Sequence, residues 1–321
     1  MTVDPDLLAR AVSLVREGKL VAFPTETVYG LGANALDPVA VLRIYRAKGR
    51  PRGSPLIVHV DSIEMARGLV REWPEAAETL ARRYWPGPLS LVLPKQPHVP
   101  DLVTAGLSTV GLRAPAHPLA LELIRRAGVP IAAPSANLFG RLSPTTAEHV
   151  RNALGREVDL ILDGGPTAVG IESTVVSLAG AHPVLLRPGM ISQHQIEALI
   201  GPVEVQGRIE DAHPSPGMHA RHYRPMTPLL LVEGGSVPTE GRGAYLRLKQ
   251  AAGAAKCVEM PPNAAAYAAV LYQSLHQLDS EGWDWIAVEA PPQSPEWAAI
   301  RDRLRRAASS TPVPVRIPEG E

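Results

Sequence analysis

Apolar residues along the first 200 positions follow helical and strand periods in irregular alternation. The spacing of Leu7, Leu8, Ala11, Leu14 and Val15 predicts a helix over 6–17. Further patterns predict helices over 38–48, 118–127, 146–154 and 193–200, and strands over 20–23, 56–60, 89–93, 110–113, 131–133, 160–162, 174–177 and 184–187. Because the alternation is irregular, we expect an α/β fold with a twisted, open sheet of mixed strand direction.

Helix start signals support several of these boundaries. Asp37 followed by Pro38 is typical of an N-cap and a first helical position, and Gly49 suits the end of that helix. Two capping boxes are predicted, Thr145-x-x-Glu148 and Ser192-x-x-Gln195.

The chain changes character between positions 202 and 228, where it is polar, rich in proline and without a period. Beyond this stretch, strands are predicted over 229–232, 285–288 and 313–317, and helices over 263–278 and 295–307. This regular alternation is typical of a small parallel, Rossmann-like α/β domain. A chain of 321 residues is long enough for two domains. We therefore predict a first domain over 1–203, a linker over 204–228 and a second domain over 229–321.

Composition narrows the class of protein. Hydrophobic residues make up 45% of the chain, and 32 basic residues balance 32 acidic ones. Zero net charge gives no overall attraction to nucleic acid or to an anionic membrane. The only cysteine, Cys257, excludes an internal disulfide and a cysteine-based zinc site. The N-terminus lacks a signal peptide pattern and no apolar run reaches about 20 residues, so we expect a cytoplasmic protein without membrane contact.

Short polar motifs punctuated by glycine and proline follow the apolar runs. Loops at the ends of strands are where a rigid sheet presents ligand-binding groups. The motifs are Pro24-Thr-Glu-Thr-Val-Tyr-Gly30, Lys48-Gly-Arg-Pro-Arg-Gly-Ser-Pro-Leu56, Thr109-Val-Gly-Leu-Arg113, Ala133-Pro-Ser-Ala-Asn137, Ser173-Thr174, Arg187-Pro-Gly189 and, in the linker, Ser215-Pro-Gly-Met218. Together they predict a site for a nucleotide and an amino acid.

Two of these motifs suit phosphate groups. Lys48, Arg50 and Arg52 are spaced by two, which in an extended loop places three cations on one side for a polyphosphate. The alternative is a solvated basic loop. Ser135 and Asn137 follow a predicted strand and can hold a phosphate or a ribose, although the same residue types form ordinary turns.

Other motif residues have equally open interpretations. Arg113 at the end of its strand can clamp a substrate carboxylate or form an ion pair. His59 is either a ligand or a core histidine, and the segment around Thr27 can be a simple turn at a strand end. Gly30 and Gly32 fit a G-x-G-x-x-A pattern, but the spacing to the strand is wrong for a dinucleotide fold. We interpret these glycines as a tight turn with close backbone packing.

The motifs taken in order resemble the Sua5/YrdC/YwlC family of threonylcarbamoyl-AMP synthases, in its two-domain Sua5 form. The resemblance rests on the motifs above together with Trp85-Pro-Gly-Pro88, Ser143-Pro-Thr145 and Glu172-Ser-Thr174. It implies a YrdC-like catalytic domain, a linker that serves as a lid and a Sua5 C-terminal domain. The implied reaction converts L-threonine, bicarbonate or CO2 and ATP into threonylcarbamoyl-AMP and pyrophosphate. That product serves the N6-threonylcarbamoyladenosine modification of tRNA, and partner proteins make the transfer, with weak or no tRNA binding by this chain itself.

The resemblance also assigns residues. It implies that Lys48 and Arg50 are catalytic, and that Tyr223, with His222 and Arg221, closes over the nucleotide. The implied ATP-binding residues are Lys48, Arg50, Ser54, Thr109, Ser135, Asn137, Ser143, Arg187 and Tyr223. The implied threonine-binding residues are Thr27, His59, Arg113, Ala133 (through its backbone) and Ser173. Mg²⁺ would accompany ATP, held mainly by phosphates and water, without a protein metal site.

Two positions depart from the family pattern, and two other functions compete with it. Ser54 stands where the family commonly has Asn, and Phe139 occupies a segment that often carries a hydroxyl. A hydrogenase-maturation carbamoyltransferase would need a zinc-finger region, which one cysteine cannot form. A non-catalytic RNA-binding module would need a basic or aromatic surface, which zero net charge and 4% aromatic residues disfavour.

Overall fold

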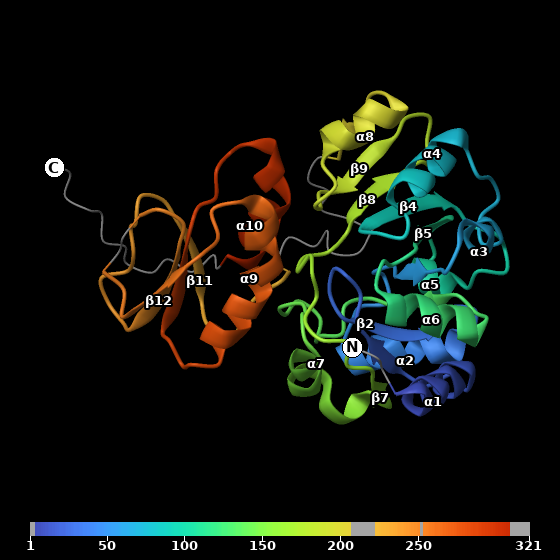
Figure 1. Cartoon of the computed structure of the whole chain (residues 1–321), viewed down its shortest axis with the longest axis horizontal. Coiled ribbons are helices and arrows are strands. Elements are labelled where there is room, and N and C mark those ends of the chain that lie inside the picture. The colour runs from blue at the N-terminus through green and yellow to red at the C-terminus, as the bar shows by residue number, and fades with distance from the viewer. Residues whose placement is uncertain (1–3, 207–221, 251–252, 309–321) are drawn as a thin grey trace.

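A computed structural model of the chain describes residues 4–206, 222–250 and 253–308. Within these ranges the chain forms two sheets, each with its own helices (Figure 1). The predicted strand over 313–317 and the motif at 215–218 lie outside the described residues.

The larger sheet contains the strands of the first 205 residues in the order β10-β9-β8-β4-β5-β3-β6-β2-β1-β7. Some neighbours are parallel, such as β3 and β5, and others antiparallel, such as β4 and β5, so the predicted mixed sheet is confirmed. Its strands are β1 (Val21–Phe23), β2 (Gly30–Asn34), β3 (Ile57–His59), β4 (Leu89–Pro94), β5 (Thr109–Arg113), β6 (Ile131–Ala132), β7 (Leu160–Ile161), β8 (Thr174–Ser177), β9 (Val184–Arg187) and β10 (Glu204–Val205). The last of these extends the sheet two residues beyond position 203.

Helices cover both faces of this sheet, as the alternation in β1 shows. Val21 and Phe23 belong to the apolar cluster that includes α1 and α6. Ala22, which lies between them, belongs to the opposite cluster with α2 and α4. The helices are α1 (Pro5–Arg16), α2 (Pro38–Lys48), α3 (Ile63–Arg67), α4 (Glu75–Tyr84), α5 (Asp101–Thr104), α6 (Pro118–Ala127), α7 (Ala147–Leu154), the 3-10 turn η1 (Gly155–Glu157) and α8 (Gln193–Ile200). The short helices α3 and α5 and the longer helix α4 were not among the predicted elements.

Helix caps agree with the sequence signals except at α7. Asp37 accepts a hydrogen bond from the Val39 amide at 2.8 Å, and Ser192 and Gln195 form the predicted capping box. The predicted box at Thr145 is wrong, because Thr146 is the N-cap of α7 and accepts from the His149 amide. Adjacent threonines offer the same chemistry, and the chain uses the second.

The glycines at 30 and 32 lie in strand β2, so the prediction of a tight turn there is wrong. The expected close packing is present. A Cβ on Gly32 would lie 2.6 Å from the Phe23 ring and 2.8 Å from a methyl carbon of Ile131. Glycine is required here because a neighbouring aromatic ring occupies the space of a side chain.

The second sheet is entirely parallel, with the order β11-β14-β12-β13, which confirms the predicted parallel α/β domain. Its elements are β11 (Leu229–Val232), β12 (Gly243–Arg247), β13 (Lys256–Glu259), α9 (Ala264–Asp279), β14 (Trp285–Glu289), the 3-10 turn η2 (Pro295–Trp297) and α10 (Ala298–Ala307). Asn263 caps α9 as predicted, whereas β12 and β13 were not predicted. None of the helices in the described ranges combines the length and apolarity that crossing a bilayer requires.

Helices α9 and α10 lie between the small sheet and the larger sheet (Figure 1). One buried apolar cluster joins Leu142 and Ile171 of the first part of the chain to Leu271 and Tyr272 of α9. The backbone at Gly170 approaches α9 so closely that a Cβ would lie 2.3 Å from the Ala268 carbonyl oxygen. The two parts of the chain are therefore packed directly against each other.

Gly170→Ala should destabilise the protein because of this approach. Gly170 has φ +79°, and the clash with the Ala268 backbone adds to the cost of that φ. We expect the free energy of unfolding to fall by about 3 kcal/mol or more. Gly106→Ala is the matched control, because Gly106 has φ +80° but no atom within 4 Å of its Cβ position, and it should cost only about 1 kcal/mol. Equal losses for the two variants in denaturant unfolding would contradict the tight contact at Gly170.

Candidate functional site

A pocket lies where the polar motifs in and beside the strands of the larger sheet converge. It encloses ≈ 50 Å³ of free space. Its walls are Thr25, Thr27, Val28, Gly30, Arg50, Ile57, His59, Arg113, Ala133, Pro134, Ser135, Glu172, Ser173, Arg187, His222 and Tyr223. Arginines, hydroxyls and a single carboxylate thus face one another from segments up to about 200 positions apart in the sequence.

Strand alternation directs His59 into this pocket. Ile57 and His59 line it, whereas Val58 lies between them in the apolar core. Parallel pairing of β3 with β5 sets His59 beside Arg113. Burial, reinforced by the Arg113 charge, lowers the pKa of His59 to about 3. His59 is therefore neutral at physiological pH.

Arg113 faces a carboxylate of the protein itself. Its Nη2 lies 2.7 Å from Glu26 Oε1 as a buried ion pair, although the angle is outside hydrogen-bonding range. Its Nε donates to the Gly87 carbonyl at 3.2 Å, and Glu26 also accepts from the Ala116 amide at 2.9 Å. The ion-pair interpretation of Arg113 is thus observed, and Glu26 was overlooked in the sequence.

Lys48 and Arg50 are buried, and backbone carbonyls supply most of their hydrogen-bond partners. The Lys48 ammonium donates to the carbonyl oxygens of Ser135 and Asn137. Arg50 donates to the Ser54 hydroxyl and to the Pro55 carbonyl at 3.0 Å. Burial, and next the Arg50 charge, lowers the pKa of Lys48, and burial lowers the pKa of Arg50 to about 10. Carbonyl dipoles hold these cations without cancelling their charge.

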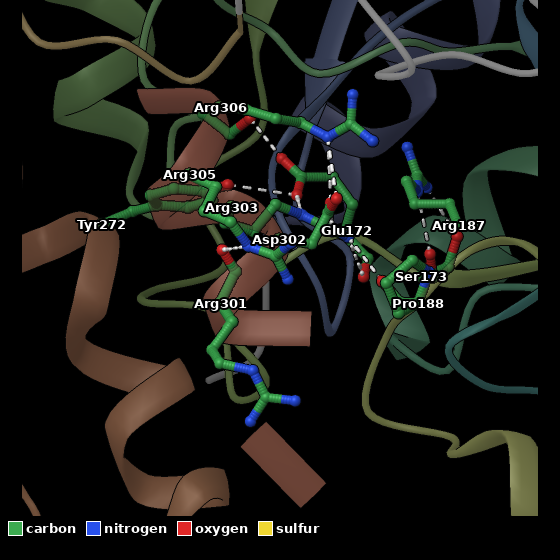
Figure 2. Close-up of polar contacts among 11 residues, drawn as sticks. Glu172, Ser173, Arg187, Pro188, Tyr272, Arg301, Asp302, Arg303, Arg305 and Arg306 are labelled. Carbon is green, nitrogen blue, oxygen red and sulfur yellow. Dashed lines mark hydrogen bonds and ion pairs between the residues drawn. The ribbon is translucent and has the colours of Figure 1, made fainter. Parts of the chain in front are cut away.

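Arg187 and Ser173 form another part of the pocket wall. The Arg187 guanidinium donates to the Ser173 carbonyl and hydroxyl, each at 3.1 Å (Figure 2). A Cβ on Gly189 would lie 2.2 Å from the Thr174 amide nitrogen, so glycine lets the Arg187-Pro-Gly189 turn lie on this segment. Glu172 borders the pocket beside them and accepts from the Ser143 hydroxyl at 2.5 Å.

Tyr223 lines the pocket. It is 1% exposed, its φ is +62°, and its hydroxyl has no hydrogen-bond partner among the described residues. His222 packs edge-on against it, with 4.2 Å between ring centroids. A positive φ is unfavourable for a tyrosine and indicates a conformation imposed by the surroundings. Arg221, the third residue implied for the lid, lies outside the described residues.

The structure brings most of the sequence-predicted residues together. Those that line the pocket are Thr27, Arg50, His59, Arg113, Ala133, Ser135, Ser173, Arg187 and Tyr223. Four others do not line the pocket but are each hydrogen bonded to a residue that does, namely Lys48, Ser54, Asn137 and Ser143. Thr109 lies at the far end of β5 from Arg113, beside Pro94, and is not in the pocket wall. The Arg50 guanidinium lies over the Phe139 ring, with 5.5 Å between Cζ and the ring centroid. Phe139, which departs from the family pattern, thus makes a cation–π contact with Arg50.

Glu172 is the main site residue that sequence reasoning did not single out. It appears in the Glu172-Ser-Thr174 motif, so its position carried a signal. No sequence signal indicated its hydrogen-bond partners, because Tyr272 and Arg303 come from the second part of the chain. Among the described residues no three His, Cys, Asp or Glu side chains group as a metal site.

Comparison with known proteins agrees with this geometry. Residues 13–189 match the Sua5/YciO/YrdC family model, which carries the description telomere recombination. Residues 191–309 match the model for the C-terminal domain of threonylcarbamoyl-AMP synthase. A threonylcarbamoyl-AMP synthase of Bacillus subtilis is 46% identical, over 96% of this chain and 94% of that protein. One of Pyrococcus abyssi is 44% identical, over 93% of each chain.

Solved structures give the same result. The crystal structure of P. abyssi Sua5 complexed with L-threonine superposes with a TM-score of 0.89 at 40% identity, and covers 96% of both chains. The similarity spans both sheets rather than the first alone. The protein therefore belongs to the two-domain Sua5 branch of the threonylcarbamoyl-AMP synthase family.

Proposed function

We propose that this protein is an L-threonylcarbamoyladenylate synthase, a nucleotidyltransferase that acts on L-threonine, bicarbonate or CO2 and ATP. The observation that carries the proposal is the convergence of Arg50, Arg113 and Arg187 with Thr27 and Ser173 on one buried pocket. Family membership supports it, as does the L-threonine bound by the P. abyssi relative. Such a site suits two anionic substrates held side by side.

The chemistry needs positioning rather than a protein nucleophile. The threonine amine first adds to the carbon of CO2 or bicarbonate and loses a proton, which gives a carbamate and, from bicarbonate, water. A carbamate oxygen then attacks the α-phosphorus of ATP, and the bond to the pyrophosphate oxygen breaks. Both electrons of that bond leave with pyrophosphate. Cations fixed around the phosphates favour this step because they stabilise charge that develops on the phosphoryl oxygens.

We assign the ATP side of the pocket to the residues around Arg50 and Arg187. In this proposal Lys48, Arg50, Ser54, Ser135, Asn137, Ser143 and Arg187 hold the nucleotide, with Lys48 and Arg50 at the reacting phosphate. The buried Asn137 Oδ1 lacks a hydrogen-bond partner among the described residues and can accept from a ribose hydroxyl. Thr109 stays a prediction, because its strand position is away from the pocket wall.

The threonine side is assigned to Thr27, His59, Arg113, Ala133 and Ser173. The Ala133 amide already donates to the Ile57 carbonyl at 3.0 Å, so a backbone contact with threonine would use the Ala133 carbonyl. Thr27 Oγ1 lies 2.8 Å from Thr25 Oγ1, which fixes the hydroxyl that faces the pocket. Arg113 would receive the substrate carboxylate in competition with Glu26.

Tyr223 would move when substrates bind. The ≈ 50 Å³ of free space holds a few water molecules but not a nucleoside triphosphate with an amino acid. Tyr223 and His222 line the pocket and belong to the part of the chain that connects the two sheets. We infer that these side chains swing out to admit ATP and close over it afterwards.

Mg²⁺ would enter with ATP. Glu172 is the carboxylate in the pocket wall, and both of its oxygens already accept hydrogen bonds, from Ser143, Tyr272 and Arg303. A site with these residues suits an ion held by phosphate oxygens and water, which is the usual coordination of Mg²⁺ at nucleotides. The ion would neutralise phosphate charge, while the chain supplies Lys48 and Arg50.

The product would feed tRNA modification in the cytoplasm. A carbamoyl group bonded to AMP is an activated acyl donor, and separate transfer proteins would pass it to the tRNA adenosine. Among the described residues, pocket cations are buried rather than displayed on an exposed stripe, so tight tRNA binding by this chain is not expected.

Pyrophosphate release measured with each amino acid, with and without bicarbonate, tests the function. We expect release only when ATP, L-threonine and bicarbonate are all present. Filter binding to tRNA at rising salt is the companion measurement. Tight, salt-sensitive tRNA binding without ATP turnover would instead identify a nucleic-acid-binding module.

Arg113→Ala should raise the KM for threonine at least about tenfold and that for ATP much less. The cause is loss of the carboxylate partner. Glu26→Gln is the matched control, since it removes the observed ion pair and keeps the guanidinium. It should leave the threonine KM within about threefold of wild type. Equal effects of Arg113→Ala on both substrates, or of the two variants on threonine, would remove Arg113 from the substrate contacts.

His59 should make the stability of the protein depend on pH. Its folded pKa is about 3, so the unfolded chain takes up a proton below pH 6.5 that the folded chain does not. The free energy of unfolding should therefore fall as pH drops from 6.5 towards 3, by up to about 1.4 kcal/mol per pH unit from this group.

Denaturant unfolding of His59→Gln between pH 7 and pH 4 checks this. The variant should show a shallower loss of stability with acid than wild type, while the exposed control His98→Gln should match wild type. Identical pH dependence in His59→Gln and wild type would mean that His59 becomes protonated in the folded protein.

A further inference from the structure

An arginine of the second domain is buried against the wall of the pocket. Arg303 lies on α10 and is 1% exposed, and it is the largest fully buried side chain among the described residues. Burying a guanidinium costs several kcal/mol unless its N–H groups and charge are matched. A position on the solvent-facing side of a short helix would have avoided that cost. The hydrogen bonds and ion pairs of Arg303 compensate this cost.

Arg303 joins two segments of the first domain (Figure 2). Its Nε donates to Glu172 Oε2 at 2.7 Å, and its Nη2 donates to the Pro188 carbonyl at 3.0 Å. Its Nη1 donates to the neighbouring Asp302 at 2.7 Å, and Asp302 is held in turn by Arg306 at 2.9 Å. The guanidinium therefore has a fixed orientation as well as fixed partners.

The two joined segments carry pocket residues at adjacent positions. Ser173 follows Glu172, and Arg187 precedes Pro188, and these two side chains hydrogen bond to each other. By holding Glu172 and Pro188 together, Arg303 thus sets the distance between Ser173 and Arg187 in the pocket wall. Small displacements here matter because a shift of about 1 Å can cost about a hundredfold in rate.

Glu172 in turn positions Ser143, which is one of the proposed ATP-binding residues. One of its oxygens accepts from the Ser143 hydroxyl at 2.5 Å, and the other accepts from Arg303 and, at 3.2 Å, from the Tyr272 hydroxyl of α9. Burial tends to raise the pKa of Glu172, but Arg303 and Arg187 hold it below the ordinary value. The carboxylate stays charged and keeps all three donors.

Arg303 also lies against Tyr223, with its Cζ 5.3 Å from the ring centroid. This is a cation–π contact, and it supports a residue whose φ of +62° is unfavourable by itself. The same arginine thus touches the proposed lid and the wall behind it.

We propose that the second domain takes part in the reaction through Arg303, a positioning residue that sets the Ser173–Arg187 wall and the closed position of Tyr223. This rests on the proposed function, and it adds a role for the second domain, none of whose described residues lines the pocket. Arg303 acts through Glu172, Pro188 and Tyr223 and does not contact substrate.

Arg303→Met tests this role in the full-length protein. Met keeps much of the volume but loses every hydrogen bond, so the KM for ATP should rise at least about tenfold, with a smaller change for threonine. Arg303→Lys restores one charged donor but cannot bridge two partners, and it should recover only part of the loss. Arg305→Met, on the exposed side of the same helix, should behave as wild type.

A second variant separates positioning from charge balance. Arg303→Met leaves Glu172 as a buried carboxylate without its main partner, which by itself destabilises the fold. Arg303→Met/Glu172→Gln removes that carboxylate charge, so its thermal midpoint should recover towards wild type. Under the proposal its affinity for a non-hydrolysable ATP analogue, measured by calorimetry, stays at least about tenfold weaker than wild type.

Wild-type ATP affinity in the double variant, or in a folded Arg303→Met protein, would overturn the proposal and leave Arg303 as a stabilising residue only. If Arg303→Met does not fold, the double variant decides. Absence of pyrophosphate release in the wild-type protein would instead refute the proposed function, and the nucleotide-binding measurements would still report on Arg303.

Discussion

Positive charge buried at the pocket is the constraint on which the rest of the structure depends. Lys48, Arg50 and Arg187 are each at most 7% exposed. A buried cation must be matched, or folding loses several kcal/mol. The chain matches Lys48 with carbonyls of the Ser135–Asn137 segment and Arg187 with Ser173. Lys48 and Arg187 are each held by the backbone of another motif, so those motifs cannot shift independently, whereas Arg50 is held within its own motif by Ser54 and Pro55.

The choice of carbonyls over carboxylates explains how the pocket can stay attractive to anions. A carbonyl oxygen satisfies an N–H group but brings only a dipole, so the net positive charge remains. The two carboxylates nearby are themselves engaged, Glu26 by the Ala116 amide and Glu172 by Ser143 and Arg303. Burial first, and the Arg50 charge second, lower the pKa of Lys48, and the negative charge of an incoming triphosphate would favour the charged form of this lysine.

Local signals made much of the fold and most of the site predictable. Helix α6 begins and ends at the predicted residues, and β8 and β9 also have the predicted bounds, because apolar runs and caps are short-range features. The motif residues were identifiable for the same reason. Strand β2 was not, because glycines that normally indicate a turn are required here by the Phe23 ring. The strands β12 and β13 were missed as well, and β13 alternates between half-buried and exposed residues.

What the sequence did not reveal depends on partners far apart in the chain. Glu172 and Arg303 are 131 positions apart, and neither residue alone distinguishes a buried ion pair from two surface charges. The same holds for Glu26 and Arg113, which meet only because β1 and β5 belong to one sheet. Pairing of this kind follows from tertiary structure and has no periodic signal.

The contact between the two domains combines two kinds of interaction with different consequences. The apolar cluster around Ile171 and Leu271 supplies most of the attraction, since burial of apolar area is not directional. A buried ion pair such as Arg303 with Glu172 adds little net stability compared with apolar residues of the same size. It does penalise every other placement, because any shift leaves a buried charge or donor unmatched. Keeping this costly polar cluster against the pocket wall is understandable if the exact placement of that wall, rather than attachment of the domain, is what Arg303 provides.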